Sequence, residues 1–374
     1  MRRLFRTLTS ARLRAQIVKE LLSILRDPRS RLVVFAPPLM QLLIFTFAAT
    51  LEVRNAEIAV YDRDAGRWSH EVVARIGAAD FVKRLHTAHS PDELRRLIDE
   101  RQVIAAIDFA PDFSRAIAAG EPATAQVIVD GRRSNAGQIT VGYLNTIVAE
   151  VGATARPDLQ IASPVSIRHW FNPNLTYRWF VVPALSGILM FFSALMITSL
   201  SIARERELGT FDQLLVSPTT TLEIIVAKAV PALAIGAALG LMMISAAAFI
   251  FRVPFTGSFV MLLPSLLLFI LSVVGIGLMI SSISATQQQA ILGSFAIGVP
   301  AVLMSGFATP VENMPTVLQW LAEAIPLKHF LIIVVGTFLK AMPPADIIAN
   351  TWPLGIIALV SLTMASWFVR GRLQ

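Results

Sequence analysis

The sequence predicts a polytopic α-helical membrane protein, with six transmembrane helices and an α/β domain between the first two. Three observations lead to this fold class. Of the 374 residues, 55% are hydrophobic and only 15% are charged, compared with a charged fraction of about 25% in soluble proteins. Several uncharged runs reach the length of about 20 helical residues that spans a bilayer core. The segment 52–178 has instead the mixed composition of a soluble domain.

The N-terminal segment, residues 1–31, predicts a cytoplasmic amphipathic helix at the membrane surface. Within 10–26, Leu13, Ile17, Leu21 and Leu25 recur every fourth residue and share one helical face. Nine of the first 31 residues are Lys or Arg, an excess typical of cytoplasmic flanks. This excess accounts for most of the net charge of +7, so the basic composition does not indicate nucleic-acid binding.

Six uncharged runs predict the membrane spans. They are 32–51, 179–201, 229–251, 258–281, 288–308 and 350–369. The third to fifth spans lie within 226–308, where SISATQQQ (281–288) is expected to divide a stretch without charge into two helices. The last segment, 350–374, contains the sixth span and a basic tail that the positive-inside tendency places in the cytoplasm, as it does the N-terminus.

The segment 309–349 predicts an external re-entrant hairpin. Its apolar core, LKHFLIIVVGTFLK at 327–340, is too short to cross a bilayer but long enough to enter and return. Prolines flank this stretch on both sides, so we expect a helical hairpin over 312–342. A full crossing here would place the basic C-terminal tail outside, against the positive-inside tendency.

The inserted segment, 52–178, predicts a compact periplasmic α/β domain, because the first span runs from inside to outside. Strands are expected at 57–62, 103–110 and 125–131, with a weaker one near 81–85. Helices are expected at 69–79, 91–101, 112–119 and 135–151, with Ser90 and Pro91 beginning the second of these. Asp62, Asp64, Asp108 and Asp112 stand at strand ends, where turns commonly use Asp.

The cytoplasmic loop 202–225 begins with four successive charges. Thr210 and Gln213 match a capping box, and Pro218 ends the short helix that they predict. Leu208, Phe211, Leu214 and Leu215 fall on one face of this helix. Such a helix either lies among lipid headgroups or docks on a soluble partner, and the spacing does not decide between them. Thr220 and Glu223 repeat the capping pattern at the start of the next span.

Three motifs together resemble the membrane subunits of ABC-2 type transporters, and most closely the bacterial multidrug-export-like permeases with a large external domain. They are FNPNL (171–175), ARERELGTFDQLLVSP (203–218) and SGFATPVENMP (305–315). The resemblance covers essentially the whole chain. It implies that the short loop helix is a coupling helix inserted into a groove of an ATPase subunit, which the N-terminal surface helix also touches. The coupling residues so implied are Arg204, Glu205, Arg206, Glu207, Leu208, Gly209, Thr210, Phe211, Leu214 and Leu215.

The energy source is expected in a partner. No Gly-Lys pair occurs in the sequence, so the chain lacks a Walker A loop. The six predicted spans contain no ionisable residue of the kind that proton-driven transporters use. We therefore expect a non-enzymatic subunit without a cofactor of its own, working with two cytoplasmic ATPase subunits that bind ATP and Mg²⁺. A second permease copy or paralogue is also expected, and a periplasmic adaptor is a further candidate partner.

The substrate path is expected to be lined by soft apolar side chains that suit amphipathic molecules. The candidates are Phe45, Phe47, Met190, Phe191, Phe192, Ser193, Phe295 and Met304. Packing against lipid or other helices is the alternative role for each. The predicted function is export of a hydrophobic or amphipathic small molecule. The alternative is a membrane-anchored sensor in which 52–178 binds a ligand. No ligand cluster surrounds the five histidines, so no metal site is predicted.

Overall fold

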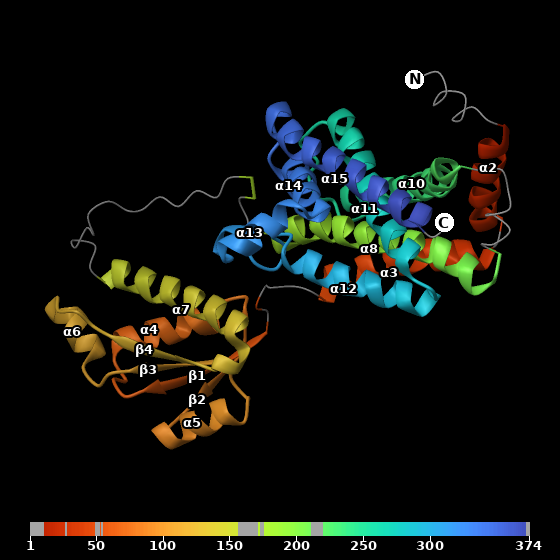
Figure 1. Cartoon of the computed structure of the whole chain (residues 1–374). Helices are drawn as coiled ribbons and strands as arrows, with labels where there is room; N and C mark the ends of the chain where they lie inside the picture. Colours follow the sequence, from red (N-terminus) through yellow and green to blue (C-terminus); the bar gives the residue numbers. More distant parts are fainter. Residues whose placement is uncertain are drawn as a thin grey trace. The chain divides into compact units, whose positions relative to one another are not determined.

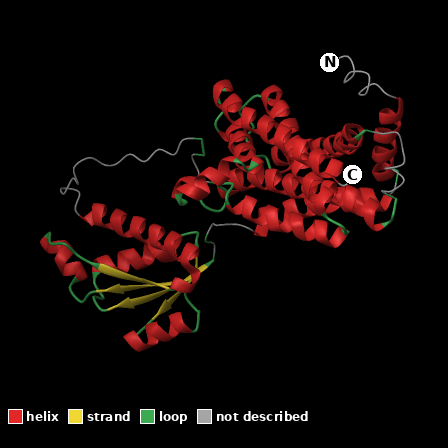
Figure 2. Cartoon of the chain, in the orientation of Figure 1, coloured by secondary structure: helices red, strands yellow, loops and turns green. Residues whose placement is uncertain are grey.

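The computed structural model describes residues 11–26, 28–48, 53, 55–155, 171–172, 176–210 and 220–371. The chain divides into two compact units. One unit, Met1–Ala48 with His169–Gln374, is helical, and the other, Ala49–Arg168, contains a β-sheet. Figure 2 shows that strands occur in the second unit, while the first is built from helices.

The helical unit begins with α2 (Ala11–Leu25) and α3 (Pro28–Ala48) and resumes after the β-sheet unit with a long helix, α8 (Figure 1). Its further elements are α8 (Tyr177–Glu207), α10 (Thr221–Ser245) with a π-helical extension η2 (Ala246–Ile250), α11 (Phe259–Ile283), α12 (Gln287–Leu303), the 3₁₀ turn η3 (Val311–Asn313), α13 (Thr316–Glu323), α14 (Pro326–Leu339) and α15 (Pro344–Gly371).

Within the part of the chain that the structure describes, four helices are long and apolar enough to cross a membrane: α8, α10 with η2, α11 and α15. The pair α13–α14 would count as a fifth span if taken together, but it is bent by 78° between its two helices. The apolar part of α3, Val34–Phe47, is shorter, and α12 has 17 residues. These lengths support a polytopic helical membrane protein, whereas the count of six spans stays a prediction.

Several helix ends differ from the predicted ones. The helix α8 continues six residues beyond Ser201 and includes the whole charged run to Glu207. The helix α15 begins at Pro344 rather than 350, and Lys228, which flanks the predicted span 229–251, lies inside α10 and is buried. Hydropathy predicts a helix end where charged residues begin. Charged residues whose side chains have polar partners in neighbouring helices can instead remain part of the helix.

Other boundaries agree with the sequence. Thr220 and Glu223 form the predicted reciprocal capping box at the start of α10, and α11 gives way to α12 within SISATQQQ. The predicted helix after Thr210 lies outside the described residues. Asn172 makes two hydrogen bonds with the backbone of Thr176, just before α8.

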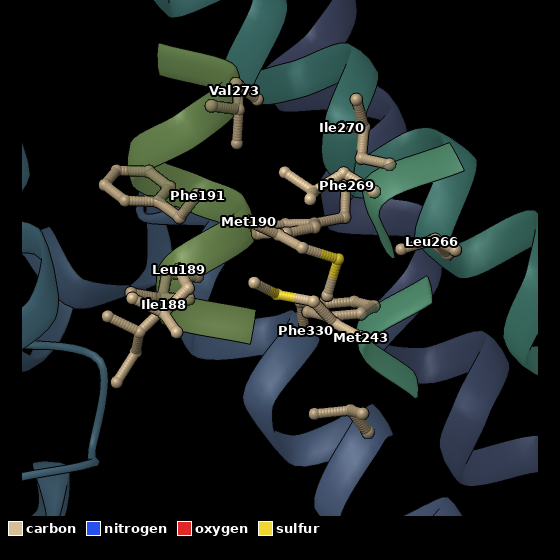
Figure 3. Packing of buried hydrophobic residues seen from close by; sticks show 14 of the residues in the cluster. Ile188, Leu189, Met190, Phe191, Met243, Leu266, Phe269, Ile270, Val273 and Phe330 are labelled. Carbon is tan, nitrogen blue, oxygen red and sulfur yellow. The ribbon is translucent and has the colours of Figure 1, made fainter. Parts of the chain in front are cut away.

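The core of the helical unit lies where α8 packs against α10, α11 and α14. Figure 3 shows Met190 of α8 beside Phe269 of α11 and Phe330 of α14, all members of one buried cluster. The rings of Phe269 and Phe330 stack with their centroids 4.1 Å apart. Near the entry of α8, the guanidinium of Arg178 lies 5.5 Å from the ring centroid of Phe47, so the end of α3 and the beginning of α8 are adjacent.

The β-sheet unit has four strands in the order β2-β1-β3-β4, with β1 parallel to β2 and β3, and β4 antiparallel. The strands are β1 (Ala56–Asp62), β2 (Val82–Thr87), β3 (Ala105–Phe109) and β4 (Ala125–Val129), and the helices are α4 (Arg67–Gly77), α5 (Pro91–Asp99), α6 (Phe113–Ala119) and α7 (Ser134–Ala155), with the 3₁₀ turn η1 (Gly131–Arg133). Figure 1 shows α4 and α7 on one face of the sheet and α5 on the other.

Side-chain alternation explains these two layers. Ile58 and Ile107 point to the side of α4 and α7, while Ala59 and Ala106 face Leu94 of α5. The predicted strands and helices of this unit are thus confirmed, including the weaker strand, and Ser90 caps α5 by accepting a hydrogen bond from the backbone of Glu93. The small alanines on the second face let the short helix α5 approach closely.

Candidate functional site

The charged motif forms the last turn of α8, and its Gly-Thr pair ends that helix. Gly209 has φ +70°, a left-handed conformation that glycine adopts without steric cost. Its N–H donates to the carbonyl oxygen of Arg206 (3.0 Å), and the N–H of Thr210 donates to that of Glu205 (2.9 Å). These two bonds define a Schellman motif, which satisfies carbonyls at a helix end. The Gly209-Thr210 pair of the motif therefore has a local structural reason.

A group of polar residues joins this helix end to its neighbours, and we call it the polar junction. It consists of Glu20 of α2, Glu205, Arg206 and Glu207 of α8, Lys228 of α10, Ser281 and Ser284 at the end of α11, and Gln287 at the start of α12.

Lys228 is the most buried charge of the polar junction. Its side chain is 4% exposed, and its Nζ lies 2.9 Å from Oε1 of Glu205 and 3.6 Å from Oε1 of Glu20. The Oε2 atom of Glu205 is buried and has no hydrogen-bond partner among the described residues. Because a buried ammonium needs a carboxylate close by, this contact ties α2 and α8 to α10.

The two residues that follow Glu205 contact the turn between α11 and α12. Nη1 of Arg206 donates to the carbonyl oxygen of Ser284 (2.9 Å), and Oε2 of Glu207 accepts from the backbone N–H of Gln287 (2.8 Å). One turn earlier, the N–H groups of Ile202 and Ala203 donate to Oγ of Ser281 at 2.9 and 3.0 Å. The end of α8 is thereby linked to α11 and to α12.

The predicted coupling residues differ in their surroundings. Glu205 and Arg206 are half-buried and Glu207 is exposed, and all three contact neighbouring helices. Arg204 and Leu208 are exposed, Leu208 by 63%. Gly209 and Thr210 form the helix end. Phe211, Leu214 and Leu215 lie outside the described residues. Which of the described residues contact an ATPase stays a prediction.

The predicted path residues differ in burial. Met190 and Phe191 are buried in the core of the helical unit, and Phe45 and Phe47 are exposed on α3. Phe192 of α8 and Phe295 of α12 are neighbours, with ring centroids 6.2 Å apart. Ser193 and Met304 are half-buried.

Sequence reasoning did not identify Lys228, Ser281, Ser284 or Gln287 as parts of a site. The signal for Lys228 was its position: a single cation at the beginning of an otherwise apolar run. The serines and Gln287 carry no local signal, because their partners lie about 80 positions earlier in the chain. Only the fold brings these residues together.

The described residues contain no group of three or more His, Asp or Glu side chains placed to hold a metal ion. Nε2 of His86 lies 2.7 Å from Oε2 of Glu57. This hydrogen bond lowers the pKa of Glu57, because its effect outweighs that of burial. The positive charges of Arg84 and Lys83 lower the pKa further. The pair joins β1 to β2, so this histidine already has a structural partner.

Comparison with known proteins agrees with this architecture. A family model described as ABC-2 family transporter protein matches residues 32–367. The chain is 42% identical to the probable multidrug ABC transporter permease YbhR of Escherichia coli K12, over 97% of this chain and 99% of the relative. It is 29% identical to the probable permease YbhS (91% of each chain) and 28% identical to the inner membrane transport permease YhhJ (84% of each), both of the same strain. The chain therefore belongs to the ABC-2 family of transporters, as a multi-pass, non-catalytic permease subunit.

Proposed function

We propose that this permease moves hydrophobic or amphipathic small molecules out of the cytoplasm or the inner leaflet, powered by a separate ATPase. The relatives named as multidrug ABC transporter permeases support export of such molecules. The absence of any Gly-Lys pair supports a separate ATPase, because a P-loop requires one. The transporter would contain two permeases, as copies or paralogues, and two ATPase subunits.

The polar junction is the observation that carries this proposal. It links α2, α8, α10, α11 and α12 at the last turn of α8, which the loop 211–219 follows in the sequence. An ATPase docked on that loop, with Leu208 and Arg204 at its border, would act on all five helices through one set of contacts. This is the arrangement that conversion of ATP binding into helix movement requires.

The proposed orientation follows the charge distribution. The basic N-terminal segment, the loop after α8 and the C-terminal tail would face the cytoplasm of a bacterial inner membrane. The β-sheet unit would then lie in the periplasm, and α13–α14 would form a re-entrant hairpin on the same side. Within the helical unit, Phe192 and Phe295 are the pair that best fits a path, because both are partly exposed and adjacent.

The first test is affinity purification of the tagged chain from its native membrane, followed by mass spectrometry. We expect a near-stoichiometric ATPase with a Walker A motif, and its loss when residues 204–217 are scrambled. A folded chain that purifies without an ATPase would contradict the proposal and would favour the sensor hypothesis.

A point substitution makes this test specific for the helix end. Alanine at position 209 would have to adopt φ +70°, which costs about 1–2 kcal/mol for a residue with a Cβ atom. Asparagine tolerates this conformation better and is the matched control. We expect Gly209→Ala to reduce ATPase capture and Gly209→Asn to retain most of it. Equal capture by both variants would show that docking does not need the Schellman geometry.

A further inference from the structure

Two adjacent residues of opposite charge hold the turn between α11 and α12. Arg206 contacts Ser284, the capping residue that directly follows α11, and Glu207 contacts Gln287, the first residue of α12. The two anchoring atoms on the turn belong to the backbone. The contacts therefore report the positions of the two helix ends rather than those of flexible side chains.

The charges match the helix ends that they contact. The C-terminal end of a helix carries partial negative charge on its free carbonyls, and the N-terminal end carries partial positive charge on its free N–H groups. Arg206 donates to a carbonyl at the first kind of end, and Glu207 accepts from an N–H at the second. Exchanging the two residues would place each charge at the unfavourable end.

We propose that Arg206 and Glu207 act as a clamp that transmits displacement of the α8 end to α12 through the α11–α12 turn. They are positioning residues in this role, and not contacts of the ATPase. The inference rests on the proposed function, because it assumes that an ATPase displaces the loop after α8.

A single substitution can remove one half of the clamp at its backbone atom. Gln287→Pro eliminates the N–H that Glu207 binds, while proline is well tolerated as the first residue of a helix. The preceding residue, Thr286, has φ −130° and ψ 160°, an extended conformation that proline requires before it. Gln287→Ala removes the same side chain but keeps the N–H, so it is the matched control.

The clamp itself is tested on the full chain in lipid nanodiscs without an ATPase. Because the sequence has no cysteine, spin labels can be attached at Leu208→Cys and Leu292→Cys, both at exposed positions. We expect a narrow distance distribution in the parent and in Gln287→Ala, and a broad one in Gln287→Pro and Glu207→Ala. The double variant should be no broader than either single variant. An equally narrow distribution in Gln287→Pro would refute the clamp.

Transmission is tested by adding the captured ATPase with ATP and vanadate. Labels at Leu292→Cys and Leu359→Cys, on the exposed faces of α12 and α15, report movement of α12. We expect a shift in the parent and Gln287→Ala and its loss in Gln287→Pro, with ATPase capture unchanged. A shift retained in Gln287→Pro, or absent from the parent, would overturn the inference. Failure to capture any ATPase would instead contradict the proposed function.

Discussion

The two cores of this protein are built by different rules. In the β-sheet unit, large side chains such as Ile58, Ile76, Ile107 and Phe109 are fully buried between the sheet and the helices that cover it. In the helical unit, equally large side chains such as Phe191, Phe269 and Phe330 are buried, but comparable apolar residues also cover the outer faces of α12 and α15.

The two units differ in the interactions that determine which elements pack against each other. Burial from water drives the sheet core together and distinguishes inside from outside. Between helices in lipid, apolar burial gives little preference, so close packing at small residues and polar contacts must select the neighbours. The polar junction is thus expected to matter more to the helical unit than surface ion pairs do to the sheet unit.

The largest expected effect is that of Lys228→Met in the helical unit. Removing the cation leaves Glu205 in a mostly buried position without its partner, and breaking such a pair costs about 3–5 kcal/mol. Thermal unfolding in detergent, followed by loss of the monodisperse species, measures the change.

Two controls make this effect interpretable. The double variant Lys228→Met with Glu205→Met should recover much of the stability, because no charge is then left unpaired. Arg63→Ala disrupts the more exposed pair with Asp108 in the sheet unit and should cost no more than about 1 kcal/mol. Comparable losses of stability from Lys228→Met and Arg63→Ala would contradict the expectation that polar contacts contribute more to the helical unit than to the sheet unit.

Ile107→Ala tests how much apolar burial contributes to the stability of the sheet unit. This side chain is fully buried in the central strand β3, and the cavity should lower the free energy of unfolding by about 2–5 kcal/mol. Hydrogen exchange of the full chain should show faster exchange in peptides from 49–168 but not in those from α8 or α11. Acceleration throughout the helical unit would mean that the two units unfold together.

Gly277→Ala should have a smaller effect on the helical unit. A Cβ atom there would overlap Oγ1 of Thr198 and lie 3.1 Å from the carbonyl oxygen of Leu195, so α8 and α11 would have to separate. Overpacking of this kind costs about 1–3 kcal/mol. The Thr198→Ala background removes the overlapping hydroxyl and should relieve part of the loss in melting temperature. Full tolerance of Gly277→Ala would indicate that this contact does not fix the helix spacing.

The smallest expected effect is the acid response of the sheet unit. Burial tends to raise the pKa of Asp64, but hydrogen bonds from Ser114, Ser69 and the backbone N–H of Gly66 outweigh it and lower the pKa. The stability that Asp64 contributes is therefore complete above its ordinary pKa of 3.8 and is lost as the pH falls below it. Hydrogen exchange between pH 6 and 3 should show a weaker pH response in Asp64→Asn than in the parent. Identical responses would assign the acid sensitivity to other carboxylates.

Much of the sheet unit could be predicted because its signals are local. Strand alternation, the Ser90 cap and the turn-forming aspartates each act within a few residues, and Asp62 and Asp64 do accept hydrogen bonds from nearby loop N–H groups. The Thr220 capping box of α10 was predictable for the same reason. Asp112 is different: it precedes α6 but its side chain makes no capping bond.

The polar junction could not be predicted in this way. Glu205 and Lys228 are separated by a loop, and Arg206 and Glu207 find partners in a turn whose sequence shows only that it interrupts an apolar run. Charge alone predicts an end of α8 near Ser201, whereas the helix continues to Glu207. Gly209 was the better signal, since a glycine just past the last turn is a common helix terminator.

The adjacency of Phe47 and Arg178 has a consequence for how this protein can vary. The polypeptide departs from the helical unit and rejoins it at neighbouring points, so the 120 residues between, Ala49–Arg168, form a cassette inserted at a single location. Any folded module with closely spaced termini could occupy that location without altering the helices on either side. The sheet unit can therefore change in sequence or length, or be replaced, while the contacts of the polar junction are kept.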